Sequence, residues 1–162
     1  MKLSHCAAVL LVAFAATGVL AESGARKSFD AMKSLSGDWQ GKTAQGRAVD
    51  VTYRMTANDS ALMSEIKSED DMITMFHLDN DRLLMTHYCG AGNQPRMQGA
   101  LSTDGKTITF DFLDATNLAS PEAGHMHHLV IQLVDADHHT EAWSYVDHGK
   151  EMTEMFALQR KK

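Results

Sequence analysis

Apolar and polar side chains alternate along most of the chain beyond residue 36, and clusters of Asp, Asn, Ser and Gly interrupt the alternation at short intervals. A period of two is typical of β-strands, whose successive side chains point to opposite faces. Between Arg47 and Met55, for example, Val49, Val51 and Tyr53 fall on one face. The same pattern predicts strands at residues 37–41, 47–55, 61–67, 72–78, 82–89, 97–101, 106–113, 127–134, 140–146 and 152–159.

One helix is predicted before the first strand, over residues 25–34, where apolar side chains recur at helical spacing until Ser36-Gly37 ends the pattern. The whole pattern indicates an all-β fold, a roughly ten-stranded antiparallel up-and-down β-barrel with a short N-terminal helix. Closure is favoured because an open meander would expose two edge strands. A barrel of this size has room for a small ligand. If the apolar faces point inward, the lining residues are Val49, Val51, Tyr53, Ile108, Phe110, Phe112, Leu129 and Ile131.

The hairpin around Asp79-Asn80-Asp81 allows its two faces to be assigned residue by residue. Asn and Asp accept positive φ, so Asn80-Asp81 is expected to form a two-residue turn. In that register Thr74 lies opposite His87, and directly opposed residues share a face. One face then carries Thr74, Phe76, Leu83, Met85, His87 and Cys89, and the other carries Ile73, Met75, His77, Leu84, Thr86 and Tyr88.

Residues 1–21 have the composition of a secretory signal peptide. Lys2 supplies a positive charge, the stretch from Ala7 to Leu20 is apolar or small, and Ala21 completes a cleavage signal before Glu22. The apolar stretch is too short for a membrane span. We therefore expect export, to the periplasm or as a secreted protein, with no membrane insertion after cleavage and one barrel domain over residues 22–162.

Charge and cysteine content narrow the functions of the mature chain. The full chain has 15 Lys and Arg against 21 Asp and Glu, a formal net charge of −6. Lys2 is the one charged side chain that cleavage removes, so the mature chain has a formal net charge of −7. An acidic surface disfavours binding to nucleic acid. Cleavage leaves Cys89 without a second cysteine in the chain, so no intramolecular disulfide can form and the core depends on packing.

Gly37-x-Trp39 after a short helix, followed by a meander that ends near Arg160, resembles the calycin superfamily. This group includes lipocalins, fatty-acid-binding proteins and nitrobindin-like haem-binding barrels. The resemblance implies that Trp39 closes one barrel end with Arg160 over its ring, as in a cation–π pair. Gly37-x-Trp39-x-Gly41 also looks like the opening of nitrobindin-like domains, and residues 86–97 are similar to a segment of small uncharacterised bacterial exported proteins.

Two pairs of side chains have the spacing of metal ligands on a strand. His87-x-Cys89 and His125-x-His127 each place two donors on one face, and imidazole and thiolate suit copper or zinc. The candidate metal ligands are therefore His125, His127, His87 and Cys89. The alternative is that these side chains are buried and hydrogen-bonded, with the many methionines serving as adaptable core. His138-His139 follows Asp135 in a turn and is expected to face solvent.

The fold and these side chains favour a protein that binds a small, largely apolar molecule inside the barrel. Its polar contacts near one mouth are predicted to be His87, Tyr88, Arg96, His125 and His127, with Arg96 in a Gly-rich loop. Met, Phe and Tyr lining suits a flat ligand such as haem. A copper- or zinc-binding protein is one alternative, and a structural or partner-binding barrel without ligand is another. An enzyme has the least support, because no Ser-His-Asp order or paired carboxylates stand out.

Overall fold

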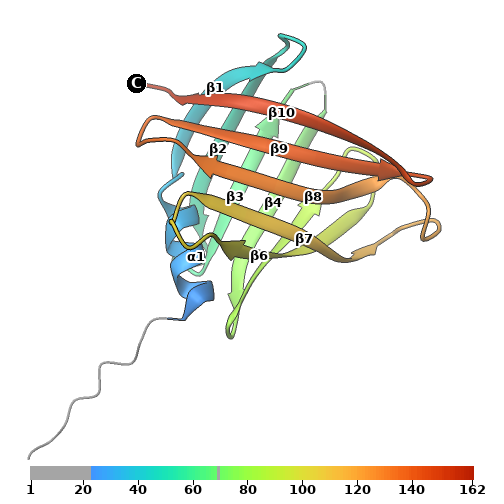
Figure 1. Cartoon of the computed structure of the whole chain (residues 1–162), viewed down its shortest axis with the longest axis horizontal. Coiled ribbons are helices and arrows are strands. Elements are labelled where there is room, and N and C mark those ends of the chain that lie inside the picture. The colour runs from blue at the N-terminus through green and yellow to red at the C-terminus, as the bar shows by residue number, and fades with distance from the viewer. Residues whose placement is uncertain (1–22, 69) are drawn as a thin grey trace, which may run out of the picture.

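The computed structural model describes residues 23–68 and 70–162, which form one helix and ten strands (Figure 1). The predicted signal peptide, residues 1–21, lies outside the described residues. The elements are α1 (Gly24–Lys33), β1 (Gly37–Thr43), β2 (Ala48–Thr56), β3 (Ala61–Lys67), β4 (Asp71–Asp79), β5 (Arg82–Tyr88), β6 (Gln94–Leu101), β7 (Thr107–Thr116), β8 (His125–Leu133), β9 (His138–Asp147) and β10 (Lys150–Arg160).

All ten strands belong to one closed antiparallel sheet. Each strand pairs with its neighbours in sequence, and β10 returns to β1 with Trp39 opposite Arg160 and Thr43 opposite Phe156 (Figure 1). The predicted all-β, ten-stranded up-and-down barrel with a short N-terminal helix is therefore confirmed. Closure pairs the first and last strands with each other, so neither presents an unpaired edge to another molecule.

The β4–β5 hairpin has the register that the Asn80-Asp81 turn predicts. Thr74 lies opposite His87, and Asn80 adopts a φ of 52°. Thr74 and His87 are buried inside the barrel, whereas His77 is half-buried on the outer side and Tyr88 is exposed. The turn thus determines which histidine of this hairpin reaches the interior.

Inward-facing apolar side chains pack into one core. Phe76 on β4 and Phe110 on β7, separated by two strands in the closed sheet, have ring centroids 5.4 Å apart. A Cβ at Gly99 would lie 2.4 Å from the Phe110 ring, so only glycine leaves room for that ring. Phe112 is half-buried. The other seven residues predicted to line the barrel belong to this core rather than to an open space: Val49, Val51, Tyr53, Ile108, Phe110, Leu129 and Ile131.

Helix α1 covers one end of the barrel (Figure 1). Ser23 caps its N-terminus by accepting a hydrogen bond from a backbone N–H of the first turn. Phe29 and Met32 are buried against the core, and the Ser28 hydroxyl accepts a hydrogen bond from the backbone N–H of Leu101 at 3.1 Å. The helix is therefore held against the C-terminal end of β6. Within the described part of the chain, no helix has the length and apolar character needed to cross a membrane.

Candidate ligand-binding site

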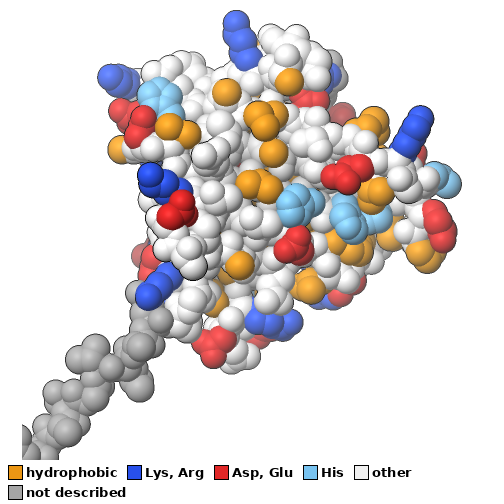
Figure 2. Space-filling model, viewed as in Figure 1, with side chains coloured by type: hydrophobic (Ala, Val, Ile, Leu, Met, Phe, Trp, Pro, Cys, Tyr) orange, Lys and Arg blue, Asp and Glu red, His pale blue; other side chains and the backbone are white. Residues whose placement is uncertain are grey.

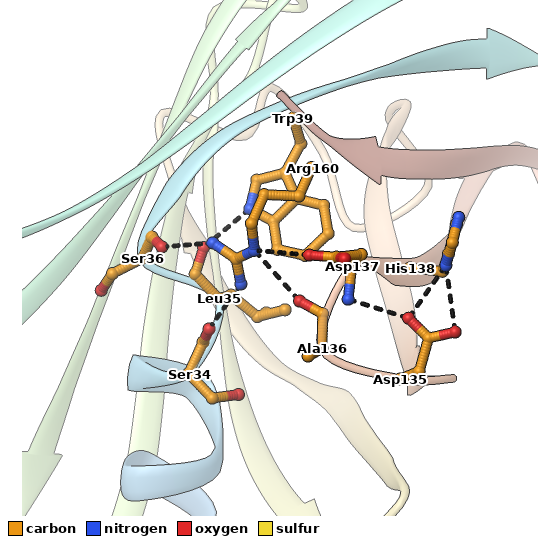
Figure 3. Close-up of polar contacts among 9 residues, drawn as sticks. All are labelled: Ser34, Leu35, Ser36, Trp39, Asp135, Ala136, Asp137, His138 and Arg160. Carbon is orange, nitrogen blue, oxygen red and sulfur yellow. Dashed lines mark hydrogen bonds and ion pairs between the residues drawn. The ribbon is translucent and has the colours of Figure 1, made fainter. Parts of the chain in front are cut away.

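The end of the barrel next to α1 is sealed by Trp39 and Arg160 (Figure 3). The Arg160 guanidinium lies 4.1 Å from the centre of the Trp39 ring, and the indole N–H donates a 2.7 Å hydrogen bond to the Leu35 carbonyl. This is the arrangement that the calycin resemblance implies. Arg160 also donates to three backbone carbonyls, those of Ser34 at 3.0 Å, Ser36 at 2.7 Å and Ala136 at 3.0 Å. Helix, first strand and last strand are thereby joined.

The opposite end of the barrel contains a cavity of about 180 Å³. It lies where β1, β3 and β9 end and where β2, β4, β8 and β10 begin. Its apolar wall comes from Ala48, Ile66, Met72, Met126, Trp143 and Phe156. Its polar side chains are Thr43, Arg47, Ser68, Asp70 and Glu154. The interior is thus packed shut beside the helix and open at the far end, which is the geometry of a binding site at a barrel mouth.

Trp143 forms a fixed wall of the cavity. Its indole N–H donates a 2.8 Å hydrogen bond to Oε2 of Glu141, and the centre of its ring lies 4.7 Å from that of His87. Only 2% of the residue is exposed to solvent. Because one edge is hydrogen-bonded and one side is in contact with another ring, the indole is held in place before any ligand arrives.

Glu141 is a fully buried carboxylate at the centre of a polar network. Oε1 accepts hydrogen bonds from the Tyr53 hydroxyl at 2.6 Å and from His139 Nε2 at 3.0 Å. Burial alone would raise the pKa of Glu141, but the hydrogen bond and charge of His139, with the bonds from Tyr53 and Trp143, hold it below its usual value. Burial and the neighbouring carboxylate raise the pKa of Tyr53. The network places a satisfied negative charge directly behind the Trp143 wall.

His139 is the clearest departure from the predicted faces. The Asp135-His138 turn was expected to carry both histidines into solvent, and His138 is exposed and hydrogen-bonded to Asp135 (Figure 3). His139 instead begins the inward face of β9 and is only 1% exposed, in edge contact with Trp39 at 4.2 Å. The prediction was wrong because the strand starts two residues earlier than residue 140 and includes both histidines.

His87 is buried beside Trp143 but does not border the cavity. Its Nδ1 is hydrogen-bonded to the Thr74 hydroxyl at 2.8 Å, and its Nε2 is buried without a hydrogen-bond partner among the described residues. Burial lowers the pKa of His87 to about 4, against a smaller opposing effect of the Glu141 charge. The imidazole is therefore neutral at pH 7.

His125 and His127 come together at the rim of the open end. Their ring centroids are 5.6 Å apart, and both rings contact Phe112, at 4.6 Å and 5.2 Å. A register shift between Met126 and His128 leaves His127 without a partner on β9, so the two rings differ in burial although they are close. His125 is buried and donates from Nδ1 to the Ala123 carbonyl at 2.8 Å, whereas His127 is exposed. Met126, between them, reaches the cavity.

The four candidate metal ligands do not form one site in this structure. Across residues 23–68 and 70–162, no three His, Cys, Asp or Glu side chains come close enough together to hold a metal ion. Cys89 is half-buried, and its sulfur accepts a weak hydrogen bond from the backbone N–H of Ala91 at 3.5 Å. Burial raises the pKa of the Cys89 thiol, which disfavours the thiolate that binds metals.

Tyr88 and Arg96 lie on the outside of the barrel, away from the cavity. Tyr88 is 49% exposed on the outer face of β5. Strand β6 begins at Gln94, three residues earlier than predicted, so Arg96 is a strand residue and not a loop residue at the mouth. Its guanidinium pairs with Asp114, which raises the pKa of Arg96. Neither side chain is placed to contact a ligand in the cavity.

Sequence reasoning missed the polar side chains that matter most in the structure, Glu141 in the interior and Arg47, Asp70 and Glu154 at the cavity. The burial of Glu141 could have been predicted, because Glu141 stands two residues before Trp143 on the same face of the predicted strand. Arg47 and Asp70 flank strand ends, where alternation gives no indication of direction, whereas Glu154 lies within β10 on the same face as Phe156. Figure 2 shows acidic, basic and histidine side chains interspersed over one outer face, so charge alone does not mark the mouth.

These features define a closed, ten-stranded antiparallel β-barrel that is sealed by a helix at one end and hollow at the other. It is similar to the solved structure of Rv2717c from M. tuberculosis, with a TM-score of 0.56 and 15% identity over 83% of this chain and 98% of that chain. It is also similar to a protein of unknown function from the DUF3598 family of Nostoc punctiforme, with a TM-score of 0.56 and 10% identity, over 81% of this chain and 49% of that chain.

At such low identities these similarities show the fold alone. No protein-family model matches the chain, and no curated protein matches it. Any functional conclusion therefore depends on the geometry of the cavity.

Proposed function

We propose that this protein is an exported, calycin-like barrel that binds a small, largely apolar molecule in the cavity at its open end. The observation that carries the proposal is the cavity of about 180 Å³ between Trp143, Phe156, Met72 and Met126. Two aromatic rings and two thioethers form a wall that adapts to an apolar surface. Export rests on the signal-peptide composition of residues 1–21.

The volume of the cavity sets the size of the ligand. An apolar cavity of about 150 Å³ holds benzene, and pockets for drug-sized ligands begin at about 300 Å³. A cavity of about 180 Å³ therefore suits a molecule with a single ring or a short branched chain. Haem is larger than this space and would bind only if the mouth widened.

The fixed position of Trp143 supports binding rather than mere incomplete packing. The hydrogen bond to Glu141 and the contact with His87 hold the indole without a ligand. A wall that is already ordered loses little conformational freedom on binding, so more of the contact energy contributes to affinity.

Titration of the folded barrel with toluene, followed by the fluorescence of its two tryptophans, tests the proposal. We expect a saturable change that is lost in Trp143→Phe, because Trp39 lies at the sealed end. Met126→Ala removes part of the wall and should shift the preference toward bulkier alkylbenzenes. Met155→Ala is the matched control, because Met155 is 49% exposed on β10 and outside the cavity.

A titration with haemin, followed by its absorbance, distinguishes the larger ligand. Saturable binding of toluene without stoichiometric binding of haemin supports the proposal as stated. If neither toluene nor any alkylbenzene gives a saturable signal with the folded protein, the proposed function is wrong.

A further inference from the structure

One carboxylate oxygen at the cavity has no hydrogen-bond partner. Oε2 of Glu154 accepts a hydrogen bond from Nη2 of Arg47 at 3.3 Å. Oε1 of the same carboxylate is buried and has no donor among the described residues. Removing a carboxylate oxygen from water without replacing its hydrogen bonds is costly. A donor from a bound molecule would relieve that cost, and Glu154 lines the cavity where such a molecule would lie.

The other groups around the cavity suit a positive charge. Among the residues that the structure describes, the ionisable side chains that line it are Arg47, Asp70 and Glu154, and the single cation of these three pairs with Glu154. Trp143 and Phe156 border the same space. The negative face of an aromatic ring attracts a cation within about 6 Å, and tryptophan does so best. The indole N–H of Trp143 donates to the Glu141 carboxylate, which polarises the ring in the favourable direction.

We infer that the ligand class of this cavity is a small organic amine, whose ammonium group donates a hydrogen bond to Oε1 of Glu154 while its hydrocarbon part packs on Trp143 and Phe156. This inference rests on the proposed function, because it names the chemistry of the molecule held at the same cavity. The unpartnered oxygen of Glu154 favours a ligand that donates a hydrogen bond. The described lining has two carboxylates and one cation, which favours a ligand with a positive charge. A carboxylate ligand of the same size is excluded by repulsion from the same groups.

The test compares three ligands of one size that differ only in the polar group: 2-phenylethylamine, 2-phenylethanol and phenylacetate. Binding to the folded wild-type protein is measured by calorimetry at pH 7. A charge-assisted hydrogen bond contributes about 1.5–3 kcal/mol, so the amine should bind at least about tenfold more tightly than the alcohol. Phenylacetate should not bind measurably.

Glu154→Gln separates recognition from a structural role. This variant should weaken binding of the amine about tenfold, since it replaces the charged acceptor, and should leave the alcohol close to its wild-type affinity. Glu151→Gln is the matched control, because Glu151 is an exposed glutamate on the same strand and does not line the cavity. It should leave the affinity for all three ligands unchanged.

Each outcome decides between the two claims. If the alcohol binds as tightly as the amine, the inference is wrong and the apolar binding site stands. If Glu154→Gln weakens amine and alcohol equally, the carboxylate only supports the cavity wall, and the inference is again wrong. If none of the three ligands binds and toluene also fails, the proposed function itself is wrong.

Discussion

The two tryptophans of the described chain stand at opposite ends of the barrel and are held in different ways. The indole N–H of Trp39 donates to a backbone carbonyl, and its ring is covered by the Arg160 guanidinium. The indole N–H of Trp143 donates to the buried carboxylate of Glu141, and its ring borders a cavity. Both residues are almost fully buried. The same residue type therefore seals the barrel at one end and lines a cavity at the other.

The partners of each tryptophan explain the difference. Arg160 satisfies three backbone carbonyls while it covers Trp39, so the guanidinium closes that end of the barrel. At the open end, Oε1 of Glu154 and Nε2 of His125 are buried without hydrogen-bond partners among the described residues. Buried polar atoms are usually paired, so the unpaired oxygen of Glu154 beside the cavity is the one that a bound donor could satisfy.

Trp39→Ala should break the sealed end and have the largest effect on stability. Truncation of a buried tryptophan costs about 3–5 kcal/mol, and here Arg160 also loses the ring beneath it. Urea unfolding followed by far-ultraviolet circular dichroism measures the loss. Trp143→Phe, which keeps a ring in place but removes a donor to Glu141, serves as the comparison and should cost less stability than Trp39→Ala. If Trp39→Ala costs no more than a surface substitution, about 0.5 kcal/mol, the sealed end does not stabilise the barrel.

The pH dependence of stability should reveal His87, the neutral histidine behind Trp143. Its pKa falls from 6.5 to about 4 on folding. Below pH 6.5 the unfolded chain binds a proton at this residue that the folded barrel does not bind. The free energy of unfolding therefore decreases as the pH falls from 6.5 to about 4, by about 3 kcal/mol in total.

Urea unfolding at a series of pH values between 6.5 and 5 isolates this contribution. The stabilisation from Glu141, whose pKa is held below 4.5, is lost only at lower pH. His87→Gln should flatten the dependence in this window. His77→Gln is the control, because His77 lies on the outer face of the same hairpin, and it should keep the wild-type slope. An unchanged slope in His87→Gln would show that another group causes the acid sensitivity.

Most of the fold was predictable because its signals are local. Alternation identified all ten strands, and the Asn80-Asp81 turn determined the faces of Thr74 and His87. The predictions failed where a bulge shifts the alternation. Because of the register shift between Met126 and His128, Met126 borders the cavity and His127 faces solvent. No residue in that segment is a sequence signal for a bulge.

The cavity was not predictable, because it depends on residues that are distant in sequence. Glu141 is buried with hydrogen bonds from Tyr53, His139 and Trp143, and Tyr53 comes from β2. The cavity wall combines side chains from seven strands, so no single segment contains its pattern. The lining residues predicted from the sequence belong to the packed core, and the holding of a ligand by the barrel stays a prediction.

Tyr88→Phe should have the smallest effect, because it tests a predicted ligand contact that the structure places outside the barrel. The hydroxyl lies on an outer side chain that is 49% exposed, and Tyr88 faces Ile73 across the β4–β5 pair. Surface substitutions of this kind change the free energy of unfolding by less than about 0.5 kcal/mol. Toluene and 2-phenylethylamine should bind with wild-type affinity. Arg96→Gln, which breaks the outer pair with Asp114, should likewise leave both affinities unchanged. A clear loss of binding in either variant, with the fold intact by circular dichroism, would place the ligand on the outer face of β5 and β6 rather than in the cavity beside Trp143.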